Sequence, residues 1–152
     1  QMGIDPAHQV SWAVEYGAGS IQVVYNRLDQ GPEEAAFPAC IEQDLGVLAR
    51  IPLASGFLSG KYQPGARFTE ELDLRSGWDR QRIEDRLQQV QQIQQEEVPD
   101  GVQMAPWALA WCLQHPAVTC VIPGCKTVEQ VESNASAADL ELVRDDHPQA
   151  WA

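Results

Sequence analysis

The sequence predicts an α/β fold in which a parallel sheet is built from about four βα units. Short apolar runs rich in β-branched residues alternate with longer stretches that carry apolar residues at helical spacing. Parallel strands need crossover connections, which are usually helices, so this alternation favours a parallel sheet. The 152 residues, 44% of them hydrophobic, suffice for one domain with its own core. We expect that domain to cover residues 1–139, followed by a polar tail over residues 140–152.

Three strands and two helices are expected before the middle of the chain. Residues Gln1–Ile4 read as a short apolar strand. A helix over about Pro6–Tyr16 begins with proline, which suits the first helical position. The run Ser20–Tyr25 is rich in β-branched residues and predicts the second strand. A helix over about Pro32–Asp44 carries a row of alanines, and the apolar run Gly46–Ile51 is the third strand.

The rest of the chain opens with a long segment rich in Gly and Ser, Leu53–Trp78, and long loops of this kind are usually functional or mobile. Apolar residues at spacings of four, three and three then predict a polar helix over about Asp79–Glu97. A strongly apolar helix, Met104–Leu113, precedes a strand at Ala117–Ile122. The last helix, Thr127–Ala138, opens with a threonine and has a glutamine three residues later, which is a capping-box pattern.

Charge and cysteine usage limit the partners that we expect. Twenty-two acidic residues against ten basic ones give a net charge of −12, so binding to nucleic acid or to an anionic membrane surface is not expected. No apolar run is long enough to span a bilayer. The four cysteines form no C-x-x-C pair and do not cluster with histidines at zinc spacing, so we expect no metal and free thiols in a reducing cytoplasm.

Ligands of parallel α/β folds lie at the carboxyl ends of the strands. The strand ending at Ile51 is followed by Pro52–Tyr62, whose small residues let backbone amides approach a phosphate closely. Lys61 and, further along, Arg67 would add positive charge. An ordinary Gly/Ser surface loop also explains this segment.

The last strand leads through a Pro-Gly-Cys-Lys-Thr turn into a helix, and helix N-termini attract phosphate. Lys126 stands at that position, and Gln130 and Asn134 project from one helix face because they are four residues apart. A capped surface helix is the alternative interpretation. Gln22 is a polar residue inside a short strand, which is typical either of a ligand-bearing interior or of a sheet edge.

Four segments taken together resemble the C-terminal half of an aldo-keto reductase. They are Ser20–Asn26, Arg50–Tyr62, Ala108–Leu113, and Val121–Gly124 with Glu129–Asn134, in that order. The Pro-Leu-Ala-x-Gly-x-x-x-Gly-Lys-Tyr loop is most similar to that of bacterial reductases and potassium-channel β-subunits. The resemblance implies the C-terminal half, about four βα units, of a (βα)8 TIM barrel. It also implies reduction of an aldehyde or ketone by NADPH. A complete barrel needs about 250 residues, so this length excludes one.

The resemblance also implies roles for individual residues. One side chain would hydrogen-bond the nicotinamide, and a guanidinium would stand where many members stack a Tyr or Trp on it. Backbone amides would wrap the pyrophosphate, and the last helix would hold the 2′-phosphate and adenine. The implied residues are Gln22 and Arg50 for the nicotinamide; Leu53, Ala54, Ser55, Gly56, Lys61 and Arg67 for the pyrophosphate; and Gly124, Lys126, Gln130 and Asn134 for the adenosine part.

The family's catalytic Asp, Tyr, Lys and His belong to the first half of the barrel, and none has a counterpart in this chain. We therefore expect the chain to supply the cofactor-binding half without the proton donor, and to be inactive by itself. Its partners would be a small carbonyl substrate and either the missing N-terminal half or a second copy. The alternative is a catalytically inactive half-barrel that acts as a binding or structural module.

Overall fold

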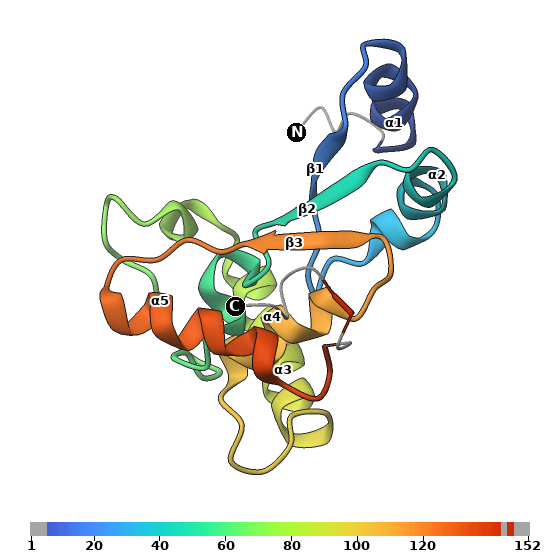
Figure 1. Ribbon diagram of the computed structural model, residues 1–152. Helices are drawn as coiled ribbons and strands as arrows, with labels where there is room; N and C mark the ends of the chain where they lie inside the picture. Colours follow the sequence, from blue (N-terminus) through green and yellow to red (C-terminus); the bar gives the residue numbers. More distant parts are fainter. Residues whose placement is uncertain (1–5, 144–145, 148–152) are drawn as a thin grey trace.

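The computed structural model describes residues 6–143 and 146–147 (Figure 1). Its sheet has three parallel strands, β1 (Ser20–Val24), β2 (Gly46–Arg50) and β3 (Val118–Ile122), in the order β1-β2-β3. The parallel pairing and three of the expected strands are confirmed within one residue at each end. The expected first strand, Gln1–Ile4, lies outside the described residues.

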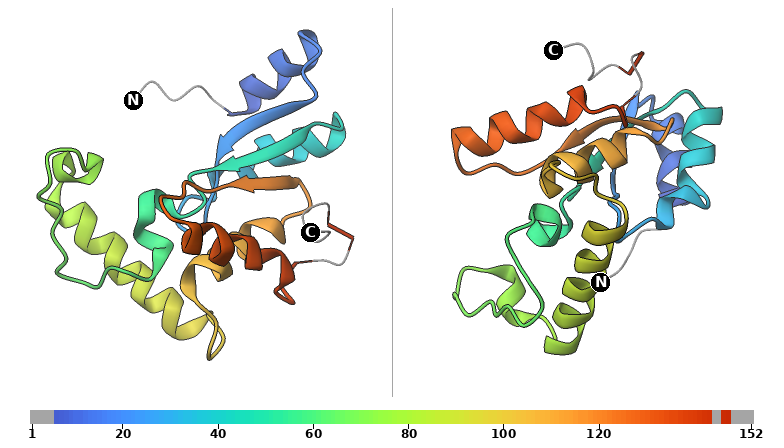
Figure 2. Two further views of the ribbon diagram at one scale, coloured as in Figure 1. Left: turned by 60° about the vertical axis from the view of Figure 1, so that its left-hand side comes forward. Right: turned by 90° about the horizontal axis from the view of Figure 1, so that it is seen from below.

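Helices connect these strands and cover one side of the sheet. Figure 1 shows α1 (Pro6–Glu15) and α2 (Ala36–Glu42) lying beside each other. The β2–β3 connection holds two helices, α3 (Arg80–Glu96) and α4 (Met104–Leu113), and α5 (Val128–Ala135) follows β3. Helix α3 lies away from the strands in both views of Figure 2.

Two expected helices are shorter than the sequence suggested. A 3₁₀ turn, η1 (Gly31–Glu33), precedes α2, and the backbone breaks at Ala35, where φ is −137°. Pro38 explains the late start of α2, because proline lacks an amide hydrogen and fits only the first turn of a helix. Helix α5 likewise ends at Ala135 and tightens into a second 3₁₀ turn, η4 (Ser136–Asp139).

The long Gly/Ser segment is packed rather than extended into solvent. It contains two 3₁₀ segments, η2 (Ala54–Ser59) and η3 (Leu74–Gly77). Phe57 of η2 is fully buried, with its ring centroid 5.7 Å from that of Trp78 and 5.8 Å from that of Phe68. These rings join the apolar side of α3 and the start of α4, so the segment is part of a second hydrophobic core.

The sheet is buried on one face only. Alternate residues of β1 and β2, represented by Val23 and Ala49, are buried beneath the helices. The opposite face carries Gln22, Arg50 and Ile122, all of which are exposed. Parallel sheets are normally covered on both faces, so this face is the one that a closed barrel would enclose.

Two of the described residues after 139, Val143 and His147, pack on the sheet core. Val143 is 5% exposed and belongs to the same core as the buried strand residues. His147 Nε2 lies 2.9 Å from the carbonyl oxygen of Val118. Within the described part of the chain, no helix is long and apolar enough to cross a membrane.

Candidate functional site

The carboxyl ends of β1 and β2 are tied together by a buried asparagine. Asn26 is fully buried just after β1, and its Nδ2 donates to the carbonyl oxygen of Ile51 after β2 at 3.1 Å and to Asp29 Oδ2 at 3.2 Å. Its Oδ1 accepts a hydrogen bond from the Leu28 amide at 3.0 Å. Asp29 in turn pairs with Arg86 of α3 at 2.7 Å. This network fixes the β1 end, the β2 end and α3 relative to one another.

Two residues implied in nicotinamide binding share the open face of the sheet. Gln22 pairs in register with Leu48, and Arg50 pairs with Val24, so Gln22 and Arg50 stand on neighbouring strands two positions apart. Both side chains are exposed. The structure therefore brings these two residues to the same surface.

The turn after β2 has unusual backbone geometry. Ile51, Ala54 and Ser55 have φ of 55°, 48° and 56°, in the left-handed region that non-glycine residues rarely adopt, and Gly56 follows with φ of 88°. The Ala54 amide donates to the Ile51 carbonyl oxygen at 2.9 Å, and the Gly56 amide donates to the Leu53 carbonyl oxygen at 2.8 Å. Two of the four amides expected to wrap a pyrophosphate are thus used to close the turn. Such strained segments gather at functional sites.

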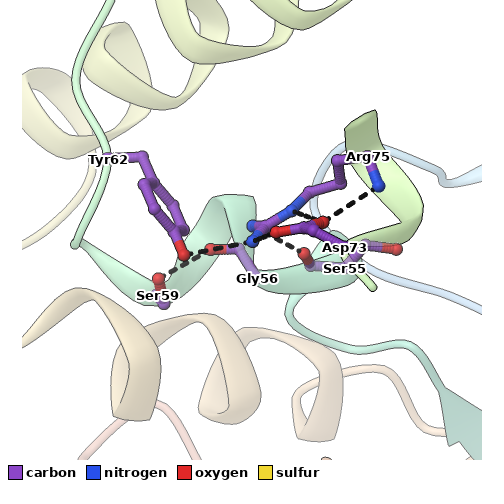
Figure 3. Close-up of polar contacts among 6 residues, drawn as sticks. All are labelled: Ser55, Gly56, Ser59, Tyr62, Asp73 and Arg75. Carbon is purple, nitrogen blue, oxygen red and sulfur yellow. Dashed lines mark hydrogen bonds and ion pairs between the residues drawn. The ribbon is translucent and has the colours of Figure 1, made fainter. Parts of the chain in front are cut away.

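Arg75 holds this turn from a distant part of the loop (Figure 3). Its Nη1 donates to the Ser55 carbonyl oxygen at 3.2 Å, and its Nη2 donates to Tyr62 Oη at 3.1 Å. Asp73 accepts from Arg75 Nε at 2.9 Å and from Nη2 at 2.6 Å, which is a bidentate ion pair. The sequence prediction missed Arg75, because only the folded loop brings it to a turn twenty residues earlier.

Lys61 and Arg67, the two charges expected beside the pyrophosphate, are exposed on the same loop. The side-chain hydrogen bonds to the turn that Figure 3 shows come from Ser59 and Arg75. The cation that the fold places against the Ser55 turn is instead Arg75, whose side chain is only 12% exposed.

The start of α5 gathers the residues implied in binding the adenosine part. Thr127 caps the helix through its Oγ1, which accepts from the Gln130 amide at 3.3 Å. The Gln130 Oε1 accepts from the Lys126 amide at 2.7 Å, and Asn134 Nδ2 contacts Cys125 Sγ at 3.1 Å. The glutamine of the expected capping box therefore reaches the residue before the cap. Both amide side chains point at the turn that carries Lys126.

The Ser55 turn and the start of α5 are linked electrostatically. Hydrogen bonds from the side chain and then the backbone of Arg75 lower the pKa of Asp73 to about 2, and the charge of Lys126 adds to this effect. Asp73 is therefore stabilised in its charged form mainly by Arg75 and to a smaller extent by Lys126. The Asp73 carboxylate keeps its charge throughout the neutral range.

This geometry predicts acid-dependent stability. Because the folded pKa of Asp73 is about 2 against an ordinary 3.8, its contribution is complete above about pH 4 and falls as the pH drops toward 2. We expect Asp73→Asn to be less stable than the wild type near neutral pH, and the difference to shrink on acidification. Urea unfolding of both proteins at several pH values measures it. A difference that stays constant down to about pH 2 would contradict the assignment.

Several other side chains that could take part in redox or acid–base chemistry are buried. All four cysteines are free, and burial raises the pKa of the Cys40 and Cys112 thiols, while Cys125 is exposed. The Tyr25 hydroxyl donates to Glu33 Oε1 at 2.6 Å, and burial is the main cause of its raised pKa. Among residues 6–143 and 146–147, no group of three or more His, Cys, Asp or Glu could hold a metal ion.

Comparisons with known proteins match this architecture. The family model described as the aldo/keto reductase family matches residues 4–150. A probable voltage-gated potassium channel subunit beta of Arabidopsis thaliana is 33% identical over 125 residues, which cover 78% of this chain and 38% of the relative. An aldo-keto reductase of Schizosaccharomyces pombe, yakc, whose name includes NADP(+), is 29% identical over 135 residues, covering 86% of this chain and 40% of the relative.

Solved structures agree with the sequence comparisons. The holo form of an aldo-keto reductase from Bacillus halodurans matches with a TM-score of 0.67 at 25% identity, covering 97% of this chain and 46% of that one. The chain thus spans less than half the length of these relatives. Its three-stranded parallel sheet corresponds to part of a TIM barrel. The family match over nearly the whole sequence shows that this chain belongs to the aldo-keto reductase family.

Proposed function

We propose that this chain is the cofactor-binding half of an NADPH-dependent aldo-keto reductase that reduces an aldehyde or ketone to an alcohol. The observation that carries the proposal is the convergence of three implied ligand groups on the carboxyl side of one parallel sheet. These groups are the open strand face with Gln22 and Arg50, the strained turn at Ser55, and the α5 start with Lys126. In Figure 1 the ends of β2 and β3 and the start of α5 lie on the same side of the molecule.

The residues fit a dinucleotide that carries negative charge in two places, the pyrophosphate and the 2′-phosphate. Arg75 and Lys126 place two cations near Asp73, and the free amides and dipole at the start of α5 favour a phosphate. At Gly124 nothing lies within 4 Å of the position that a Cβ would occupy, so the backbone there faces open space. Lys126 and the start of α5 thus supply local positive charge in a protein whose net charge is −12.

When bound, NADPH would supply a hydride to the carbonyl carbon of the substrate. In this proposal Gln22 orients the nicotinamide through its carboxamide, and the Arg50 guanidinium lies against the ring. The Ser55 turn holds the pyrophosphate, while Lys126, Gln130 and the backbone at Gly124 hold the 2′-phosphate. The proton donor comes from the other half of the barrel, and the substrate is a small carbonyl compound. A cytoplasmic location is part of the proposal, supported by the four free cysteines.

A complementation experiment tests the activity. The chain is joined to the N-terminal half of a related reductase, and NADPH oxidation is followed with a small aldehyde. We expect oxidation by the joined protein and none by the chain alone. A folded joined protein that binds no NADPH would refute the proposal. The matched control is the same joined protein with Lys126→Ala, which should require more NADPH for half-maximal rate.

The uncovered sheet face also favours a second candidate, a half-barrel that closes its open face against another copy. Gln22, Arg50 and Ile122 are exposed on a face that parallel sheets normally bury. Size-exclusion chromatography with light scattering separates the two candidates. A stable dimer with no affinity for NADPH supports the binding module, and a species that binds NADPH supports the reductase half.

Cysteine labelling gives a local prediction for the cofactor site. Cys125 is exposed in the turn before Lys126, whereas Cys40 and Cys112 are buried. We expect iodoacetamide to alkylate Cys125 first and NADPH to slow that reaction, because the adenosine phosphate would cover the turn. NADH, which lacks the 2′-phosphate, should protect less. Equal rates with and without saturating NADPH, measured by mass spectrometry, would place the cofactor elsewhere.

A further inference from the structure

We propose that Arg75, held by Asp73, is a positioning residue that keeps the turn at Ser55 and Gly56 in its phosphate-binding shape before any ligand arrives. The inference rests on the proposed function, because it concerns how the same phosphate site is formed. It differs from the sequence-based assignment, in which Lys61 and Arg67 supply the positive charge of this loop. The hydrogen bonds, ring contacts and backbone angles around Arg75 carry it.

The donors of Arg75 are largely committed within the protein. A guanidinium has five N–H groups. Nε and Nη2 donate to the two oxygens of Asp73, Nη2 also donates to Tyr62, and Nη1 donates to the Ser55 carbonyl oxygen. Four of the five are therefore used by described residues. Arg75 acts on a bound phosphate chiefly through the peptide that it holds.

Aromatic rings fix the plane of the guanidinium. The Arg75 Cζ lies 3.8 Å from the ring centroid of Phe68 and 4.7 Å from that of Tyr62. Arginine stacks favourably on aromatic faces, and the side chain here is only 12% exposed. The bidentate ion pair with Asp73 fixes the direction in which the guanidinium points. Arg75 is therefore a rigid support for the turn.

The turn needs such a support. Left-handed backbone at non-glycine residues persists only where the surroundings hold it, and Ser55 has φ of 56°. Its carbonyl oxygen is the atom that Arg75 Nη1 contacts. A Cβ at Gly56 would lie 3.2 Å from the same nitrogen, so the guanidinium occupies the space beside the glycine. The two features depend on each other: the glycine makes room and the arginine fixes the turn.

The experiment compares the wild type with Arg75→Ala, Arg75→Lys, Asp73→Asn and the double variant Asp73→Asn/Arg75→Ala. Arg80→Ala is the matched control, because Arg80 is an exposed cation on α3 outside the site. The first readout is hydrogen exchange of the Ala54 and Gly56 amides without ligand. The second is the Kd for NADPH, measured by fluorescence titration. Circular dichroism first establishes that each variant is folded.

We expect Arg75→Ala to speed exchange of both amides about tenfold and to weaken NADPH binding by about tenfold or more, since a charge-assisted hydrogen bond is lost. Arg75→Lys should be nearly as impaired, because an ammonium cannot reproduce the fork. Asp73→Asn should show a smaller effect in the same direction. In Asp73→Asn/Arg75→Ala the effects should not add, because the two residues act as one unit.

Unchanged exchange in Arg75→Ala would overturn the inference, even if NADPH binding fell, because Arg75 would then contact the phosphate directly. Full rescue of binding by Arg75→Lys would overturn it as well. If the wild type binds no NADPH, the proposed function fails, but the exchange readout still decides whether Arg75 holds the turn. Faster exchange in Arg80→Ala would show that the effect is not local to Arg75.

Discussion

Replacing Phe57 with alanine should lower the free energy of unfolding by about 3–5 kcal/mol, the usual cost of removing a buried phenyl ring. Phe57 is fully buried and contacts the rings of Trp78 and Phe68. It directly follows Ser55 and Gly56, so its ring anchors the Ser55 turn to the second core. Thermal unfolding followed by circular dichroism should show a Tm lower by about 10 °C or more.

A matched control separates burial from loop position. Leu72 lies in the same connection but is 96% exposed, so Leu72→Ala should leave Tm nearly unchanged. A loss below about 1 kcal/mol in Phe57→Ala would mean that the long connection does not pack as described. It would also remove the packing that supports the Ser55 turn.

Lys126→Ala should weaken NADPH binding by about 10–100-fold while changing NADH binding much less, because a charged hydrogen bond contributes about 1.5–3 kcal/mol. Lys126 stands directly before the capped start of α5, and its amide is fixed by Gln130. The helix dipole and the ammonium therefore act on the same position. This is where the proposal puts the 2′-phosphate, which distinguishes NADPH from NADH.

Dissociation constants for both dinucleotides, measured by fluorescence titration at one fixed salt concentration, test this prediction. Lys126→Arg should retain most of the affinity, because it keeps the charge. Equal losses for NADPH and NADH would show that Lys126 does not contact the 2′-phosphate. A change confined to low ionic strength would indicate a long-range charge effect instead of a contact.

Much of the fold follows from local sequence. The strands were predictable because they are short apolar runs, two of which start at a glycine or directly after one, and two of which are followed by a proline. Helix α3 was predictable because Ile83, Leu87, Val90 and Ile93 repeat along one face and are all buried. The break before α2 was missed, since its start depends on Pro38 in a helix that is otherwise favourable. Trp12 on α1 is 48% exposed and donates to His8 Nε2 on the same helix. Whether an aromatic residue is covered depends on the neighbouring elements.

The sequence likewise predicted some residues of the candidate site and missed others. Gln130 and Asn134 were placed on one helix face by their spacing, whereas the sequence pattern left Gln22 open between a ligand-bearing interior and a sheet edge. Arg75 was not predicted as a site residue, because nothing in the local sequence distinguishes it from other loop arginines. Only the folded loop brings it to the Ser55 carbonyl oxygen. The backbone strain at Ala54 and Ser55 was also invisible, since neither residue type favours a left-handed conformation.

Titration of the isotope-labelled chain with NADPH, followed by amide NMR, tests the central claim most directly. The account predicts saturable one-to-one binding, with chemical-shift changes in residues 53–61 and 124–134 and at Gln22. The aromatic cluster of α1, at Trp12 and Tyr16, should be unaffected, because it lies outside the site. A folded spectrum that does not change at saturating NADPH, or changes confined to other regions, would contradict a cofactor-binding role.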